Sequence, residues 1–210
     1  MASAPEPRPH SPPGASQPHL HQRSREIQRF DQLRSMPLAL PEEVCSEMAA
    51  ELNLILSDTR ILHDLYKKTH WLVRGATFYP LHLLMDKHAE EQEKLVDLLA
   101  ERVQALGGVA VGDPRHVAEL TRIPRPPDGV EEVPAMLSRL VDTHEAIIRE
   151  TRKVARRAEE LEDYVSNDIL ISDVLRTNEL QVWFIAEHLV DRPLVIVPES
   201  KSGAGPTPMH

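Results

Sequence analysis

One stretch of this sequence carries histidines and carboxylates at spacings that suit a metal site. His82 and Asp86 are four residues apart, Asp97 and Glu101 are again four apart, and eleven residues separate Asp86 from Asp97. On a helix, four residues make about one turn, and eleven return to within about 20° of the same face but roughly 16 Å further along the axis. The two pairs of one chain therefore cannot share a metal ion.

A two-fold axis would bring the two pairs together. If two copies of this helix pack antiparallel about an axis between residues 91 and 92, Asp97 of one copy lies level with Asp86 of the other. Glu101 then lies level with His82 of the other copy. An isologous dimer would thus assemble two identical sites, each with one pair from each subunit.

The residue types narrow the kind of metal. His70 lies just before the turn at Gly75 and could reach over as a further nitrogen ligand. Carboxylates with one or two imidazoles and no thiolate suit iron or manganese. The sequence contains no Glu-x-x-His, so the di-iron site built within one bundle is not encoded. The alternative is that these residues form the ordinary polar face of an amphipathic helix.

Proline and glycine divide the chain into helix-sized segments, because both are costly inside helices and tolerated at their ends. Apolar residues recur within the segments at three- and four-residue spacing, the period of a helix with one buried face. Asp113–Pro114 is a typical start for a short helix, and Ser166–Asp168 supplies N-capping residues. Long helices are expected over residues 42–74, 78–106, 131–162 and 168–190.

This order of elements predicts an all-α protein. No segment alternates with period two, so strands are not expected. Four long helices, with a longer connection and a short helix between the second and third, describe a four-helix bundle of ferritin-like connectivity.

Composition separates a bundle domain from two tails. Residues 1–40, rich in proline with arginine and histidine, are expected to be a flexible N-terminal tail; residues 41–192 form the bundle domain, and residues 193–210 a C-terminal tail. The single cysteine, Cys45, excludes an intrachain disulfide framework and favours a reducing cytoplasm. We identify no signal peptide and no apolar run near the roughly 20 residues that span a bilayer.

Charge is unevenly distributed along the chain. The net charge of −9 argues against non-specific binding of nucleic acid by the fold as a whole. Residues 1–35 carry five arginines, three acids and no lysine, whereas residues 36–197 have a balance of −11. An acidic body of this kind attracts cations.

The ligand-rich stretch resembles the signature of the Dps family, the miniferritins that protect starved bacterial cells. The similarity rests on the string HWLVRGATFYPLH over residues 70–82, followed by the spaced carboxylates and by Gly107–Gly108. It covers about residues 45–192 and leaves out both tails. Membership implies a homo-oligomeric, dodecameric cage of four-helix subunits with ferroxidase sites at two-fold interfaces.

The resemblance also implies an activity, that of a ferroxidase. His70, His82 and Asp86 of one subunit, with Asp97 and Glu101 of its partner, would bind Fe(II) and pass its electrons to hydrogen peroxide or dioxygen. Ferric iron would mineralise in the cavity, protecting DNA and the cell in the cytoplasm or at the nucleoid. The alternative is a structural, DNA-binding shell with little ferroxidase activity. A lysine-free tail gives DNA binding weak support.

Other aromatic and imidazole side chains are assigned mainly to packing. We expect Trp183 to lie in the core, and we leave Trp71 open between packing and oxidation beside the site. His88 faces away from the His82 side of its helix, so a structural or surface role is expected, and His144 has no ligand-spaced partner.

Overall fold

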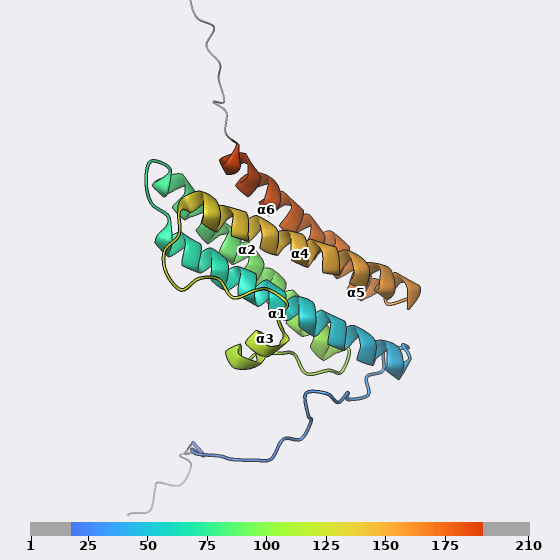
Figure 1. Cartoon of the computed structure of the whole chain (residues 1–210). Helices are drawn as coiled ribbons and strands as arrows, with labels where there is room; N and C mark the ends of the chain where they lie inside the picture. The colour runs from blue at the N-terminus through green and yellow to red at the C-terminus, as the bar shows by residue number, and fades with distance from the viewer. Residues whose placement is uncertain (1–17, 191–210) are drawn as a thin grey trace, which may run out of the picture.

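A computed structural model describes residues 18–190, in which every regular element is helical. The elements are α1 (Glu42–Leu72), α2 (Phe78–Ala105), α3 (Pro114–Leu120), α4 (Val133–Glu160), α5 (Tyr164–Asp168), the π-helix η1 (Ile169–Leu175), α6 (Arg176–Ala186) and the 3₁₀-helix η2 (Glu187–Leu189). The elements from α5 to η2 follow one another directly, so the described chain has four long helices and one short one (Figure 1). The prediction of an all-α bundle is confirmed.

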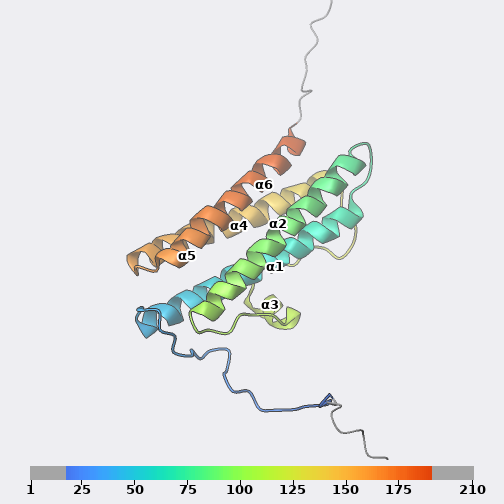
Figure 2. The same ribbon diagram turned by 180° about the vertical axis from the view of Figure 1, so that it is seen from behind.

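The connection between α2 and α4 sets the topology of the bundle. It leaves the end of α2, forms α3 at the side of the bundle, and returns along the bundle to the end where α2 began (Figure 1). As a result α2 and α4 run in the same direction, while α1 and α6 run in the opposite one. A single long crossover of this kind is the ferritin-like arrangement. In Figure 2, α2 and α6 face the viewer.

The helix ends near the start of the crossover follow from local chemistry. Asp113 caps α3 because its carboxylate accepts a hydrogen bond from the Arg115 backbone N–H at 2.9 Å. Just after α2, Gly107 adopts a φ of +89°, a region that favours glycine. The Gly107 carbonyl also accepts a bond from the Arg34 N–H at 2.8 Å, which fixes the N-terminal segment against the end of α2.

The start of the last helix differs from the prediction. The helix begins at Tyr164, not at residue 168, because Asp163 is its N-cap and accepts from the Ser166 N–H at 3.1 Å. Arg102 of α2 donates to the same carboxylate at 2.5 Å, and both side chains are buried. This ion pair fixes the turn before residue 164 and leaves Ser166 inside the helix.

The hydrophobic core lies between the four long helices. On α1, Met48, Leu52, Ile55 and Leu56 are buried at the expected three- and four-residue spacing. No helix of the described residues is both long and apolar enough to span a bilayer. Residues 1–17 of the expected N-terminal tail and all of the expected C-terminal tail lie outside the described residues.

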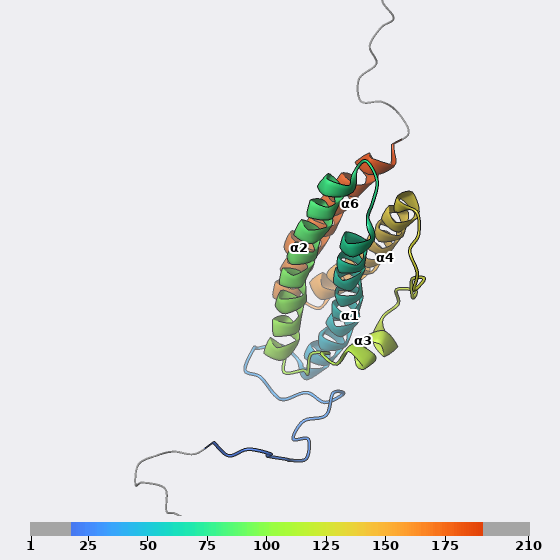
Figure 3. The same cartoon turned by 90° about the vertical axis from the view of Figure 1, so that its left-hand side faces the viewer.

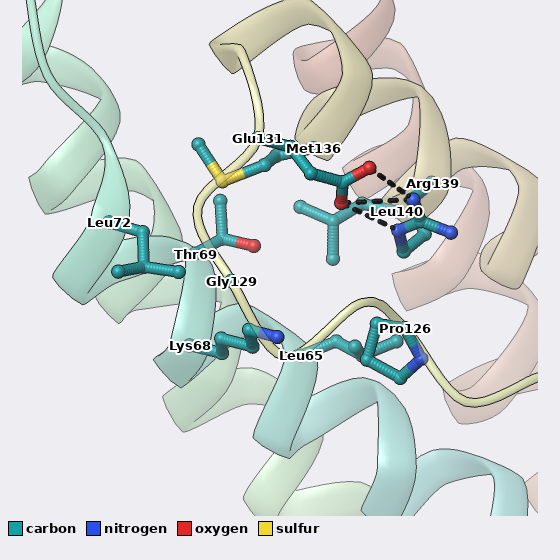
Figure 4. A pocket seen from close by; sticks show the side chains of 10 residues that line it. All are labelled: Leu65, Lys68, Thr69, Leu72, Pro126, Gly129, Glu131, Met136, Arg139 and Leu140. Atoms are coloured by element: carbon teal, nitrogen blue, oxygen red, sulfur yellow. Dashed lines mark hydrogen bonds and ion pairs between the residues drawn. The ribbon is translucent and has the colours of Figure 1, made fainter.

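The crossover is attached to α1 and α4, and a small pocket remains beneath it (Figure 4). Lys68 of α1 donates to the Pro127 carbonyl of the crossover. Glu131, just before α4, accepts two hydrogen bonds from one guanidinium nitrogen of Arg139, at 2.7 and 2.9 Å. None of the five predicted metal ligands lines this pocket.

Candidate metal centre

The end of α1 and the start of α2 bring two predicted ligands into contact. The turn between the helices is short and passes through Gly75 with a φ of +91°, so the last turn of α1 lies beside the first turn of α2. Figure 3 looks onto this end of the bundle. The imidazole rings of His70 and His82 are stacked, with centroids 3.7 Å apart and planes at 20°.

Reciprocal hydrogen bonds fix the orientation of both rings. Nδ1–H of His70 donates to the His82 carbonyl at 2.9 Å, and Nδ1–H of His82 donates to the His70 carbonyl at 3.0 Å. Because each Nδ1 carries a proton, the neutral form of each ring has its free lone pair on Nε2. Neutral imidazoles oriented through the other ring nitrogen are typical of metal-binding histidines.

Asp86 lies one turn after His82 and pairs with a cation of the same chain. Its carboxylate accepts a hydrogen bond from Lys67 and lies 3.9 Å from Nδ1 of His70. The Lys67 ammonium holds the pKa of Asp86 below its ordinary value, through the hydrogen bond first and its charge second. The carboxylate is therefore ionised at neutral pH and is neutralised by an ammonium where a metal cation would also bind.

Lys67 was not predicted from the sequence. The signal was available, because Lys67 precedes His70 by three residues and so lies on the same face of α1. Phe78 was also missed: its ring stacks on His82 with centroids 5.1 Å apart. Its position four residues before His82 in the first turn of α2 would have indicated that contact.

The other two predicted ligands lie far along α2. Asp97 and Glu101 are exposed on its second half, about 16 Å and about 22 Å from Asp86 by helix rise. Within residues 18–190, no three His, Cys, Asp or Glu side chains of one chain are placed to hold a metal ion. One chain thus presents two separate parts: the first half-site, His70, His82 and Asp86, and the second half-site, Asp97 and Glu101.

An apolar rim lies next to the first half-site along α1 and α2. It consists of the exposed large side chains Trp71, Phe78, Tyr79 and Leu83, at the end of α1 and the start of α2. Trp71 is 70% exposed, so it does not pack in the core of the single chain. The expectation that Trp183 lies in the core is wrong: it is 59% exposed on α6. Both tryptophans are free to contact another molecule.

Comparisons with known proteins agree with this architecture. The chain matches the family model described as the ferritin-like domain over residues 49–195. An uncharacterised protein of Kitasatospora aureofaciens is 57% identical over 148 residues, 70% of this chain and 99% of that protein. The nutrient stress-induced DNA-binding protein of a Synechococcus strain is 32% identical over 163 residues, 78% of this chain and 92% of that protein.

The chain is also similar to solved structures of Dps proteins. DpsC from Streptomyces coelicolor is 63% identical, with a TM-score of 0.81 and coverage of 82% of this chain and 100% of that one. An archaeal Dps homologue from Halobacterium salinarum is 29% identical, with a TM-score of 0.74 and coverage of 85% and 97%. The single crossover and the family match define a ferritin-like helical bundle. Within that class, the chain belongs to the Dps family.

Proposed function

We propose that this protein is a ferroxidase and iron-storage cage whose metal sites form between two subunits. One observation carries the proposal: a single chain brings His70 against His82 and Asp86, while Asp97 and Glu101 lie about 16 Å and about 22 Å from Asp86 along α2. The spacing is palindromic, so an antiparallel partner would place its second half-site opposite the first.

Each ligand would have a defined role toward Fe(II), the substrate. His70 and His82 offer Nε2 lone pairs that are already oriented, and Asp86 offers a carboxylate once the metal displaces Lys67. Asp97 and Glu101 of the partner subunit would add two exposed carboxylates and offset the positive charge of ferric iron. The apolar rim supports coverage of this face by a second copy, because large apolar side chains favour burial.

The oxidant would be hydrogen peroxide or dioxygen. Two Fe(II) ions supply the two electrons that peroxide needs to become water, so hydroxyl radical is not released. Ferric iron would then mineralise in the cavity of a dodecamer, and the acidic balance of the bundle supports cation uptake there. Removal of Fe(II) and hydrogen peroxide would protect the cell and its DNA, in the cytoplasm or at the nucleoid.

Complementation between two inactive variants tests the shared site. One variant is His82→Ala/Asp86→Ala, and the other is Asp97→Ala/Glu101→Ala. In a mixed dimer, one site combines both intact half-sites and the other combines both altered ones. Random co-assembly should therefore restore about a quarter of the wild-type sites, while each variant alone restores none.

The measurement is anaerobic loading with Fe(II), followed by hydrogen peroxide, with ferric absorbance and hydroxyl radical recorded together. We expect ferric iron at half an equivalent of peroxide per iron, with no radical signal. Mixed assemblies of correct size that oxidise iron no faster than a protein-free control would overturn the shared site. The same failure in the wild type would overturn the ferroxidase itself.

A DNA-binding shell with little ferroxidase activity is the second candidate, favoured by the similarity to the nutrient stress-induced DNA-binding protein of Synechococcus. The described residues give it limited support, because three exposed arginines of α4 are already paired. Arg149, Arg152 and Arg157 each contact a glutamate at 2.6 Å, from Glu145, Glu179 and Glu47. DNA retardation that persists at physiological salt and is retained by both ligand variants would favour this candidate.

A further inference from the structure

A row of hydrogen-bonded polar side chains crosses the interior of the bundle and joins its four long helices. Tyr66 belongs to α1, His88 to α2, His144 to α4 and Asn178 to α6, and the side chains are fully buried. None of these residues belongs to either half-site. Polar groups that replace apolar packing at the centre of a core call for an explanation, because burying them is costly.

The direction of each hydrogen bond follows from the Asn178 amide. Its Nδ2 donates to the Val174 carbonyl at 2.7 Å, so its Oδ1 must be the acceptor that faces His144. Nδ1 of His144 lies 2.8 Å from that oxygen and therefore carries the proton. Nε2 of His144 is left with a free lone pair.

That lone pair accepts a hydrogen bond from the Tyr66 hydroxyl. The Tyr66 hydroxyl lies 2.5 Å from Nε2 of His144 and 3.2 Å from Nδ1 of His88. Since the hydroxyl donates to His144, His88 must donate its Nδ1–H to the phenolic oxygen. The phenolic proton of Tyr66 thus stays on the tyrosine and points at a neutral base, in a position fixed from both sides.

The row is not arranged to satisfy every member, as a purely structural network would be. Among the described residues, Nε2 of His88 is buried without a hydrogen-bond partner, and so is Oε1 of Gln92, whose amide nitrogen donates to Asn178 Oδ1 at 3.4 Å. Burial also raises the pKa of Tyr66 well above its ordinary value, so the phenol does not ionise by itself. Loss of its proton becomes favourable only when an electron leaves as well, because an oxidised phenol is a much stronger acid than imidazolium.

Tyr66 is also close to the first half-site. It precedes His70 by one turn of α1, about 6 Å along the helix axis. We propose that Tyr66 is an internal one-electron donor to the iron site, with His144 as the acceptor of its proton. This inference rests on the proposed ferroxidase function.

The donor is needed when only one Fe(II) ion is bound, because peroxide requires two electrons. Peroxide then takes one electron from Fe(II) and one from Tyr66, its O–O bond breaks, and two protons from solvent complete two water molecules. Fe(II) becomes Fe(III). Tyr66 becomes a neutral tyrosyl radical, and its proton moves to Nε2 of His144. Without this electron, the second product would be a hydroxyl radical.

The chain contains three tyrosines, which allows a direct assignment. Tyr79 and Tyr164 are exposed, so Tyr79→Phe/Tyr164→Phe leaves Tyr66 as the only tyrosine with little effect on packing. Assembled protein with one Fe(II) per site is mixed with one equivalent of hydrogen peroxide, frozen rapidly and measured by electron paramagnetic resonance. We expect an organic radical whose spectrum narrows with ring-deuterated tyrosine and is unchanged by ring-deuterated tryptophan.

Two variants test the roles of Tyr66 as electron donor and His144 as proton acceptor. Tyr66→Phe should lose the tyrosyl signal and release several-fold more hydroxyl radical at one iron per site. His144→Gln keeps a hydrogen-bond acceptor but removes the base, and it should lower the radical yield several-fold. Both variants must first be shown to form assemblies of the wild-type size. If Tyr66→Phe does not fold, the Tyr79→Phe/Tyr164→Phe variant still tests whether Tyr66 carries the radical.

Each contrary result has its own meaning. Ferric product without a tyrosyl radical overturns the proposal and leaves the ferroxidase function standing. A signal that narrows with deuterated tryptophan identifies another donor, such as the exposed Trp71, and also overturns it. An unchanged yield in His144→Gln overturns His144 as the proton acceptor. No ferric product above the protein-free control overturns both proposals.

Discussion

The buried histidines should make this protein lose stability between pH 7 and pH 5. Burial lowers the pKa of His88 to about 4 and that of His144 to about 3, because charged imidazolium is poorly solvated in the core. Near His88, Glu91 opposes this shift and Lys87 adds to it. Both imidazoles are therefore neutral in the folded protein, whereas an unfolded histidine protonates near pH 6.5.

The sign follows from proton uptake. Between about pH 6.5 and pH 4 the unfolded chain binds more protons than the folded one, so stability falls as pH falls. A pH of 5 lies about 1.5 units below the pKa of an unfolded histidine. Protonation of the unfolded chain therefore lowers the free energy of unfolding by about 2 kcal/mol per histidine that stays neutral in the fold. The two together should lower the free energy of unfolding by about 4 kcal/mol relative to pH 7.

Urea unfolding followed by circular dichroism at pH 7 and pH 5 measures this loss, at one fixed protomer concentration because assembly contributes to stability. His144→Gln should lose about half of the difference, since glutamine accepts the Tyr66 hydrogen bond but does not titrate. His188→Gln, at an exposed position, is the matched control and should retain all of it. An equal pH difference in wild type and His144→Gln would refute the neutral, buried imidazole at this position.

Three further substitutions test other parts of the structure. Arg102→Met leaves the buried Asp163 carboxylate without its partner and should cost about 3–5 kcal/mol in urea unfolding; a loss below about 1 kcal/mol would contradict the ion pair. Gly107→Ala places a side chain at positive φ against a backbone carbonyl and should cost more than about 1 kcal/mol, whereas Gly112→Ala, in open space, should change stability by less than about 0.5 kcal/mol. Lys67→Met removes the cation that competes with a metal, so calorimetric titration with Zn(II) should give a few-fold tighter binding; weaker binding would mean that the lysine positions its carboxylate partner.

Local periodicity determined most of the helical framework. The predicted bounds of the first two helices, 42–74 and 78–106, agree with α1 and α2 to within two residues. Apolar spacing, proline and glycine act within a few residues along the chain, so they can be read without knowing the fold. The same is true of the ligand spacing on α2, because helical rise alone separates the two half-sites. The assembly of the two half-sites into one metal site across a dimer interface remains a prediction.

Contacts between distant segments decided the rest. The last helix begins at Tyr164 because Arg102, 61 residues earlier than Asp163, holds the capping carboxylate in place. The Tyr66–His144 bond joins residues 78 positions apart, and no local pattern indicates it. The pairing of Lys67 with Asp86 likewise required the turn that brings α1 beside α2. Sequence determined where helices form and which residues share a face; packing decided which of those residues meet, because burial and pairing energies depend on neighbours that only the fold supplies.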